Sequence, residues 1–144
     1  MSNAPIYRGN CFSGAVEITA AGEPVAMGYC HCRSCRHWSA SSVNAATLWK
    51  SENVTVTRGE DNVVTYHQTD KSYRKSCRTC GGHICNEHPT WGVIDIYAAI
   101  IPDLSYRPAF HVNYAETVLP MKDGLPKFRD FPKDFGGSGE LLPE

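Results

Sequence analysis

The sequence predicts an all-β fold with a few short helices, and three observations lead to this prediction. Apolar and polar residues alternate with a period of two in several short runs, and turn-forming residues separate those runs. No run of twelve or more residues shows the apolar stripe of an amphipathic helix. With 144 residues, of which 42% are hydrophobic, we expect a single domain over residues 1–144 whose core forms without disulfides.

The alternation of β-branched and aromatic residues with polar ones places the expected strands. In the first of these, Val16 and Ile18 share one face while polar residues occupy the other. The expected strands cover residues 14–20, 53–57, 63–68, 92–100 and 109–114.

The segments between and after these strands carry turn and helix signals. Residues 57–62, TRGEDN, are expected to form a hairpin turn, because Gly59 and its polar neighbours tolerate turn dihedrals. Short helical turns are expected after Cys32 and near residues 131–135. From Leu119, prolines and glycines predict an extended segment that wraps the body and ends in a flexible tail at about residues 136–144.

Composition and charge exclude several classes of protein. The net charge of −1 provides no overall field that would attract nucleic acid or an anionic membrane. The best spanning candidate, residues 93–101, is far shorter than the ~20 apolar residues of a spanning helix, and Asp95 interrupts it. No secretory signal is visible in the first thirty residues, so a cytoplasmic location is expected.

Seven cysteines in such a chain favour metal binding or catalysis over a disulfide framework, because an odd count cannot pair completely. The stretch YCHCRSCRHW places Cys30, Cys32 and Cys35 within six positions. A disulfide inside C-x-C is strained, whereas three thiolates on one loop can hold a single ion and leave its fourth position open. The alternative is that His31, His37 or Cys85 closes the site.

A second cluster has the spacing of a zinc knuckle. Cys77 and Cys80 form C-x-x-C followed by two glycines, and glycine permits the tight turn of such a knuckle. A redox dithiol uses the same spacing, but usually at the start of a helix in an α/β protein. Because a structural zinc takes four ligands, we expect another segment to contribute, and Cys11 is the natural candidate.

The order of these motifs resembles that of the glutathione-dependent formaldehyde-activating enzymes, with which centromere protein V is usually grouped. The matching segments are GNCFSGAV, then CHCRSCR, then CRTCG before a strand, and finally HVNYAETVLPMKDGLPKF at residues 111–128. The resemblance covers nearly the whole chain, and its motifs are specific in combination. It implies the β-tent fold, in which sheets meet around zinc-binding cysteine loops.

The resemblance also implies two zinc sites. In the family, the first cysteine pair and the late C-x-x-C hold a structural zinc, which assigns Cys11, Cys77 and Cys80 to that ion. Ser13 stands where the family has a second cysteine, and a neutral hydroxyl is a poorer zinc ligand than a thiolate. A bound water, another side chain or weak binding each remain open at that position.

The second implied zinc is catalytic, and Cys30, Cys32 and Cys35 match the family's catalytic trio. The sequence leaves open whether both zinc sites are filled. The implied reaction is that of a carbon–sulfur lyase, which joins glutathione to formaldehyde as S-(hydroxymethyl)glutathione or runs in reverse. The partners would be a small thiol and a small aldehyde. Arg33 and Arg36 would form a rim for the glutathione carboxylates, unless they are only solvated surface charges.

Two other hypotheses stay open. The chain could be a non-catalytic, zinc-stabilised β domain that binds glutathione or a protein partner, and Ser13 mildly favours this. It could also be a nucleic-acid-binding zinc ribbon, although the near-neutral charge counts against that. The sequence assigns no role to His31, His83, Cys85 and Asp95, and no oligomeric state.

Overall fold

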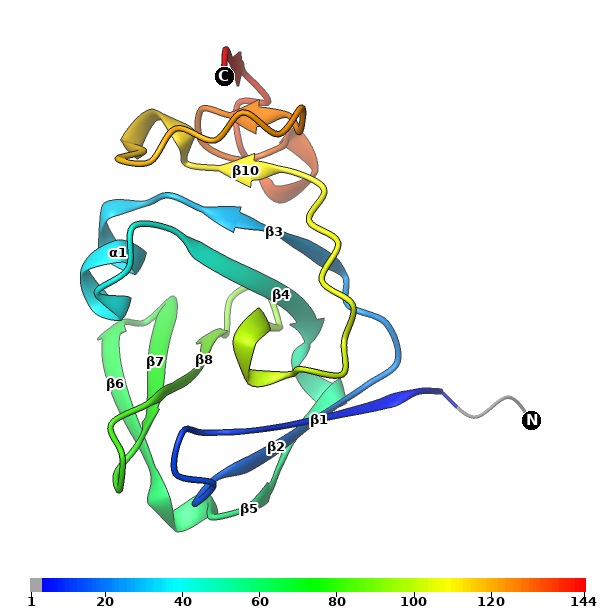
Figure 1. Ribbon diagram of the computed structural model, residues 1–144, viewed down its shortest axis with the longest axis vertical. Coiled ribbons are helices and arrows are strands. Elements are labelled where there is room, and N and C mark those ends of the chain that lie inside the picture. The colour runs from blue at the N-terminus through cyan, green and yellow to red at the C-terminus, as the bar shows by residue number, and fades with distance from the viewer. Residues whose placement is uncertain (1–3) are drawn as a thin grey trace. The chain divides into compact units, whose positions relative to one another are not determined.

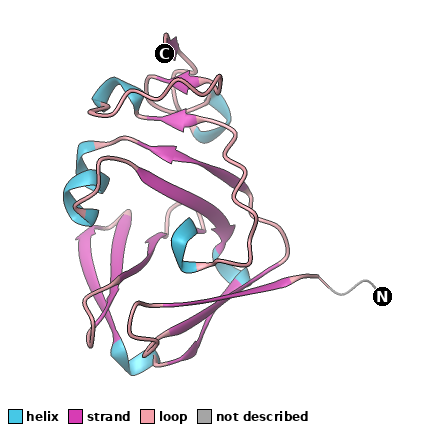
Figure 2. Ribbon diagram, in the orientation of Figure 1, coloured by secondary structure: helices cyan, strands magenta, loops and turns pink. Residues whose placement is uncertain are grey.

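The computed structural model describes residues 4–144, and it confirms the mostly-β fold class. Figure 2 shows strands (magenta) throughout, joined by loops and short helical segments (cyan). The one α-helix among the described residues is α1 (Arg33–Ser39). The remaining helical segments are 3₁₀ turns: η1 (Ser51–Asn53), η2 (Glu60–Asn62), η3 (Ala98–Ile100), η4 (Tyr114–Glu116) and η5 (Lys133–Phe135). Over residues 4–144, no helix has the length and apolar character needed to cross a membrane.

The chain folds as two compact units. Unit 1 consists of Met1–Val25 and Thr47–Tyr106, and unit 2 consists of Ala26–Ala46 and Arg107–Glu144. Each unit therefore combines segments that lie far apart in the sequence, and each contains one of the two cysteine clusters. The sequence-based expectation that residues 1–144 act as one domain stays a prediction.

Unit 1 contains a three-stranded antiparallel sheet in the order β1 (Ile6–Asn10), β2 (Glu17–Ala21) and β5 (Val54–Arg58). It also contains an antiparallel series in which β6 (Val63–Thr69) pairs with β7 (Ser72–Cys77), β7 with β8 (His83–His88), and β8 with β9 (Val93–Tyr97). Figure 1 labels β6, β7 and β8, which are drawn in green. The strand β4 (Asn44–Lys50) begins in unit 2 and ends in unit 1.

The core of unit 1 is apolar. Alternate residues of its strands point inward, as the period of two predicts. The buried cluster contains Val16, Ile18, Ala20, Trp49, Ile84, Ile94, Ile96 and Ile101, together with Cys11, Cys77 and Cys85. Trp49 finds a partner for its indole N–H in the Thr47 hydroxyl at 2.8 Å, so this large side chain is buried without an unpaired donor.

Unit 2 is built around β3 (Ala26–Cys30), whose chain runs directly through Cys32 into α1. The short strand β10 (His111–Val112) pairs in parallel with β3 and with β11 (Lys127–Phe128), and β12 (Leu141–Leu142) pairs antiparallel with β11. Figure 1 shows β10 (yellow) beside β3 (blue). The Phe110 ring packs directly against Gly28 of β3, so a side chain at that position would clash with the ring.

The centre of unit 2 is polar, in contrast to that of unit 1. His31, His111 and Lys127 are buried, with exposed fractions of 0%, 0% and 1%. The ring of Tyr114 packs edge-on against both histidines. Such groups are stable in the interior only when they are hydrogen-bonded, and His31, His111 and Lys127 all have hydrogen-bond partners.

Three local expectations differ from the structure. Residues 57–62 form a turn but not a hairpin, because β5 pairs with β2 while β6 pairs with β7. The expected strand 92–100 ends at Tyr97, where the chain enters η3. The expected tail at 136–144 contains paired structure, since Leu141–Leu142 pairs with β11 and Glu144 Oε2 accepts a hydrogen bond from Lys127 Nζ at 2.9 Å; its flexibility stays a prediction.

Candidate metal centres

The first cysteine cluster, hereafter the buried triad, joins three segments of unit 1. Cys11 follows β1, Cys77 ends β7, and Cys80 lies in the turn after it; the three Sγ atoms lie within 4.8 Å of one another. The turn is that of a knuckle, since the Gly81 amide donates to the Cys77 carbonyl at 2.8 Å. Gly81 has φ +71°, a conformation that suits glycine. The structure thus brings together the residues expected for one metal ion.

Each sulfur of the buried triad accepts a hydrogen bond from an N–H group. The Val16 amide donates to Cys11 Sγ at 3.3 Å, and the Gly82 amide donates to Cys80 Sγ at 3.4 Å. Asn62 Nδ2 donates to Cys77 Sγ at 3.1 Å. Such donors favour thiolates over thiols, which is the form that binds metal.

Ser13 lies beside the same three sulfurs. Its Oγ is 3.5 Å from Cys11 Sγ and 3.8 Å from Cys77 Sγ. Hydrogen bonds from Ser13 and from the Gly82 amide lower the pKa of Cys80 to about 6. Burial raises the pKa of Cys11, but hydrogen bonds from Ser13 and the Val16 amide outweigh it and leave that pKa below its ordinary value.

The second cluster, hereafter the open trio, lies within one short stretch of unit 2. Cys30 ends β3, Cys32 precedes α1 and Cys35 lies in its first turn; their Sγ atoms also lie within 4.8 Å of one another. Cys32 is the N-cap of α1, because its sulfur accepts a hydrogen bond from the Cys35 amide at 3.2 Å. All three residues are partly exposed; of the buried triad, Cys11 and Cys77 are buried and Cys80 is partly exposed.

The pKa values of Cys30 and Cys32 in the open trio are shifted in opposite directions. Hydrogen bonds with Cys30 and Cys35, helped by the Cys35 amide, lower the pKa of Cys32 to about 3. The bonds with Cys32 and Cys35, together with burial, raise the pKa of Cys30 well above its ordinary value. Negative charge at neutral pH therefore concentrates on Cys32, with Cys30 as a donor to it.

The geometry and the donors of both clusters fit zinc. Zn–S bonds of about 2.3 Å in a tetrahedron place neighbouring sulfurs about 3.8 Å apart. Cys30 Sγ and Cys35 Sγ are separated by 3.8 Å, and thiolate sulfur is a donor that zinc prefers. The trio supplies three of the four usual ligands, and no other Cys, His or carboxylate of residues 4–144 joins it.

None of the residues considered as a closing ligand fills that role. Both ring nitrogens of His31 are engaged, Nε2 with His111 Nδ1 and Nδ1 with Thr117 Oγ1, each at 2.8 Å. His37 is exposed, and its ring nitrogens do not join the sulfurs of the trio. Cys85 belongs to the apolar core of unit 1, where burial raises its pKa to about 12, so it behaves as a small hydrophobic residue.

A buried polar network continues from His31 into the centre of unit 2. His111 Nε2 lies 2.7 Å from Asp123 Oδ2, and Lys127 Nζ contacts Asp123 Oδ1. Lys127 Nζ also donates to Leu125 O at 2.9 Å. Burial lowers the pKa of His31 to about 4, so His31 is neutral at physiological pH.

The network immobilises the loop that carries the open trio. His31 lies between Cys30 and Cys32, and its ring is held by the network while its backbone amide donates to Val112 O at 3.1 Å. In addition, Asn113 Nδ2 lies 3.6 Å from Cys30 Sγ. The cysteine motifs did not indicate these supporting residues; the sequence signal for them is that residues 111–128 resemble a segment of the family.

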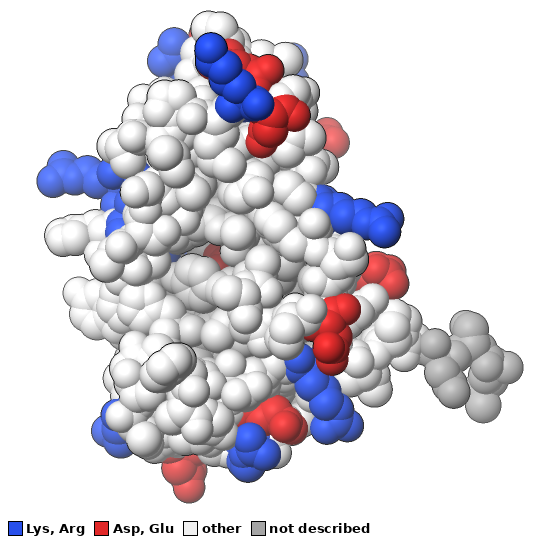
Figure 3. Space-filling view, in the orientation of Figure 1, with Lys and Arg blue, Asp and Glu red and all other residues white. Residues whose placement is uncertain are grey.

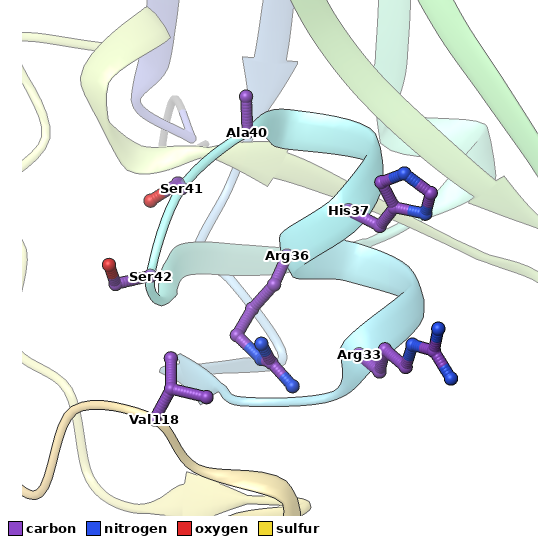
Figure 4. A pocket seen from close by; sticks show the side chains of 7 residues that line it. All are labelled: Arg33, Arg36, His37, Ala40, Ser41, Ser42 and Val118. Carbon is purple, nitrogen blue, oxygen red and sulfur yellow. The ribbon is translucent and has the colours of Figure 1, made fainter.

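The two arginines expected as a rim differ in their surroundings. Arg36 is tied to the backbone, because its Nε donates to His31 O at 2.9 Å and its Nη2 donates to Glu116 O at 3.1 Å. Arg33 is exposed and lies with Arg36 and His37 around a hollow of about 430 Å³. Figure 4 shows these three side chains projecting from α1, with Val118 facing them from the C-terminal segment.

The remaining candidates, His83 and Asp95, lie in unit 1. Asp95 is satisfied by hydrogen bonds, from Asn86 Nδ2 at 2.9 Å and with His88 Nε2 at 2.6 Å. Burial and the nearby Arg74 charge lower the pKa of His83.

On the face shown in Figure 3, basic and acidic side chains are interspersed, in keeping with the net charge of −1.

The chain matches a protein family and is similar to solved structures. Residues 6–116 match the family model described as glutathione-dependent formaldehyde-activating enzyme. The crystal structure of a Rhodobacter sphaeroides protein aligns with a TM-score of 0.57 and 24% sequence identity, over 68% of this chain and 90% of that one. This structural match supports the fold alone. Among proteins of curated function, none matches the chain.

Proposed function

Because the chain belongs to the family of glutathione-dependent formaldehyde-activating enzymes, we propose that it is a zinc-dependent carbon–sulfur lyase resembling S-(hydroxymethyl)glutathione synthase. The observation that carries this proposal is the open trio, three partly exposed sulfurs within 4.8 Å on one loop with no fourth protein ligand among the described residues. A closed structural site takes four protein ligands, whereas a catalytic site takes three.

The proposed reaction joins the sulfur of glutathione or a related thiol to the carbon of formaldehyde or a related aldehyde. A C–S bond forms, the carbonyl π bond breaks, and the thiol proton ends on the former carbonyl oxygen, so that no electrons are gained or lost overall. Zinc held by Cys30, Cys32 and Cys35 would supply the Lewis acidity that lowers the pKa of an incoming thiol.

The residues around the trio would position the thiol substrate. Glutathione is an anion, and the hollow beside α1 presents the exposed guanidinium of Arg33 together with His37. Arg36 contributes differently, since its hydrogen bonds to the carbonyls of His31 and Glu116 brace the cysteine loop. We propose Arg33 as the main carboxylate contact and Arg36 as a positioning residue.

The test is an assay of adduct formation with zinc-loaded protein, glutathione and formaldehyde, measured against the uncatalysed rate. We expect acceleration by the unaltered chain and none by Cys32→Ser, because that substitution removes a sulfur of the trio whose pKa is lowered to about 3. Equal rates with and without protein would exclude the lyase and leave a non-catalytic zinc domain.

The carboxylate contact is tested by Arg33→Ala. We expect the KM for glutathione to rise about tenfold with a smaller change in kcat, as for the loss of one charge-assisted contact. The matched control is Arg107→Ala, which removes the same charge from another exposed position of unit 2 and should leave KM unchanged. An equal rise of KM in both variants would indicate a general effect of net charge.

A further inference from the structure

Ser13 is a polar side chain at the buried triad, and the proposed lyase chemistry does not explain why it lies there. We propose that Ser13 Oγ is the fourth ligand of a zinc ion held by Cys11, Cys77 and Cys80, so that protein atoms alone close this site. The inference rests on zinc binding at the buried triad, which belongs to the proposed function, but not on catalysis by the open trio.

The position of the hydroxyl fits a coordination vertex. In a tetrahedron with Zn–S bonds of about 2.3 Å and a Zn–O bond of about 2.0–2.2 Å, oxygen and sulfur lie about 3.5–3.7 Å apart. Ser13 Oγ is 3.5 Å from Cys11 Sγ and 3.8 Å from Cys77 Sγ. Hydrogen bonding between Ser13 and Cys80 brings the oxygen to the third sulfur as well.

The loop holds this oxygen in place. The Ala15 amide donates to Ser13 Oγ at 3.3 Å, which fixes one lone-pair direction of the hydroxyl. The surrounding turn is closed by hydrogen bonds from the Gly14 amide to Cys11 O and from the Cys11 amide to Val16 O, both at 3.0 Å. Gly14 itself has φ +82°, which glycine adopts without strain.

The other candidates for the fourth vertex are few. Among residues 4–144, no further Cys, His or carboxylate side chain joins the buried triad. Asn62 approaches Cys77 Sγ at 3.1 Å, but it does so with its Nδ2, a donor that cannot bind a cation. Among the described side chains, the Ser13 hydroxyl is therefore the oxygen positioned to act as the fourth ligand.

The charge of the site also agrees with a neutral fourth ligand. Three thiolates and one hydroxyl leave Zn²⁺ with a net charge of about −1, whereas four thiolates would leave about −2. The N–H groups of Val16, Gly82 and Asn62 each donate to one sulfur and disperse that charge.

The experiment uses Co²⁺ as a spectroscopic probe in the full chain carrying Cys30→Ser and Cys32→Ser, so that cobalt binds at the buried triad alone. With Ser13 present, we expect a tetrahedral cobalt spectrum that excess imidazole does not change. With Ser13→Ala added, we expect cobalt affinity to fall at least about tenfold and imidazole to shift the spectrum, since a vertex is now free.

Two further variants act as controls. Asn62→Ala removes a hydrogen bond to Cys77 but no ligand, so affinity should fall while the spectrum stays insensitive to imidazole. Ser13→Cys should give a four-thiolate spectrum and bind at least about tenfold more tightly, because thiolate is the stronger donor. The Cys variant also provides a result if the Ala variant does not fold.

The possible outcomes separate the two proposals. An imidazole response with Ser13 intact, or an unaltered spectrum in Ser13→Ala, would overturn the assignment of Ser13 while leaving the zinc site in place. Failure of the background variant to bind cobalt at all would instead overturn the buried metal site itself. Neither result depends on enzymatic activity.

Discussion

The two cysteine clusters present the same number of sulfurs in different settings. The buried triad joins Cys11 to the Cys77–Cys80 knuckle, so it forms only when distant segments of unit 1 have come together. The three sulfurs of the open trio lie within the junction of β3 and α1, so they are close together in the chain, although residues of distant segments support their loop. The comparison shows that the buried triad forms only when unit 1 is folded, whereas the cysteines of the open trio are all partly exposed.

The surroundings of the clusters differ in the same direction. Cys11 and Cys77 belong to the apolar core of unit 1. The open trio is instead supported by polar contacts, from Asn113 on Cys30 to the network of His31, His111 and Asp123. Apolar packing suits a site that must not exchange with solvent, and a polar network orients ligands while leaving them reachable.

The largest effect expected from this comparison is on stability. Cys77→Ser should lower the free energy of unfolding of the zinc-loaded protein by about 3 kcal/mol or more, because it opens a buried metal site. The same change at Cys32 should cost less than about 1 kcal/mol, because the open trio is local and partly exposed. Urea denaturation monitored by circular dichroism measures both.

Chelation of the metal provides the control for this pair. With zinc removed, the difference between Cys77→Ser and Cys32→Ser should shrink, since most of it comes from metal binding. Equal losses in the loaded state would contradict the division into a structural and an accessible cluster.

A smaller effect is expected when the polar network of unit 2 is weakened. Burial raises the pKa of the Asp123 carboxyl, but hydrogen bonds from Lys127 and His111 outweigh it and hold that pKa below its usual range. Because the unfolded state then binds the proton more readily, this contribution to stability is present above about pH 4 and is lost as the pH falls further.

Asp123→Asn should therefore cost about 2 kcal/mol at pH 7, where it leaves buried Lys127 without its nearest carboxylate. The difference from the unaltered chain should diminish below about pH 4, where the Asp123 carboxyl of the unfolded state becomes protonated. Protonation of Glu144 and of the cysteines affects both proteins alike. A difference that stays constant down to pH 2.5 would show that the charge of Asp123 is unimportant.

The smallest effect concerns the support of one sulfur. Asn113→Gly removes the side chain that lies 3.6 Å from Cys30 Sγ but preserves the backbone, since Asn113 has φ +53°. Zinc affinity at the open trio should fall about tenfold, as expected for an outer-shell contact, while the buried triad keeps its affinity. Competition with a chromophoric chelator measures both sites, and an equal loss at both would argue against a local role.

Much of this organisation could be predicted from sequence where spacing is short. The C-x-C-x-x-C run and the C-x-x-C-G knuckle identify two clusters because their ligands are neighbours in the chain. The participation of Cys11 was predicted from the need of a zinc knuckle for further ligands, and the family resemblance supported it; no local pattern joins Cys11 to Cys77. The mostly-β class was predicted from the alternation of apolar and polar residues. That alternation did not predict strands such as β7 and β8.

The missed strands have a physical explanation. Buried positions in β7 and β8 hold polar residues, Arg74 and Asn86, so that hydrophobic periodicity does not distinguish their two faces. The network of unit 2 was missed for a related reason. Its partners, His31, His111 and Asp123, come from separate segments whose hydrogen bonds exist only after folding.

The 3.8 Å separation of Cys30 Sγ and Cys35 Sγ has a practical consequence for anyone who handles this protein. Dissolved oxygen or peroxide can remove two electrons and two protons from this pair and leave a disulfide. Aged preparations would then bind less metal for a purely chemical reason. Freshly reduced, anaerobic samples are therefore the proper material for counting zinc.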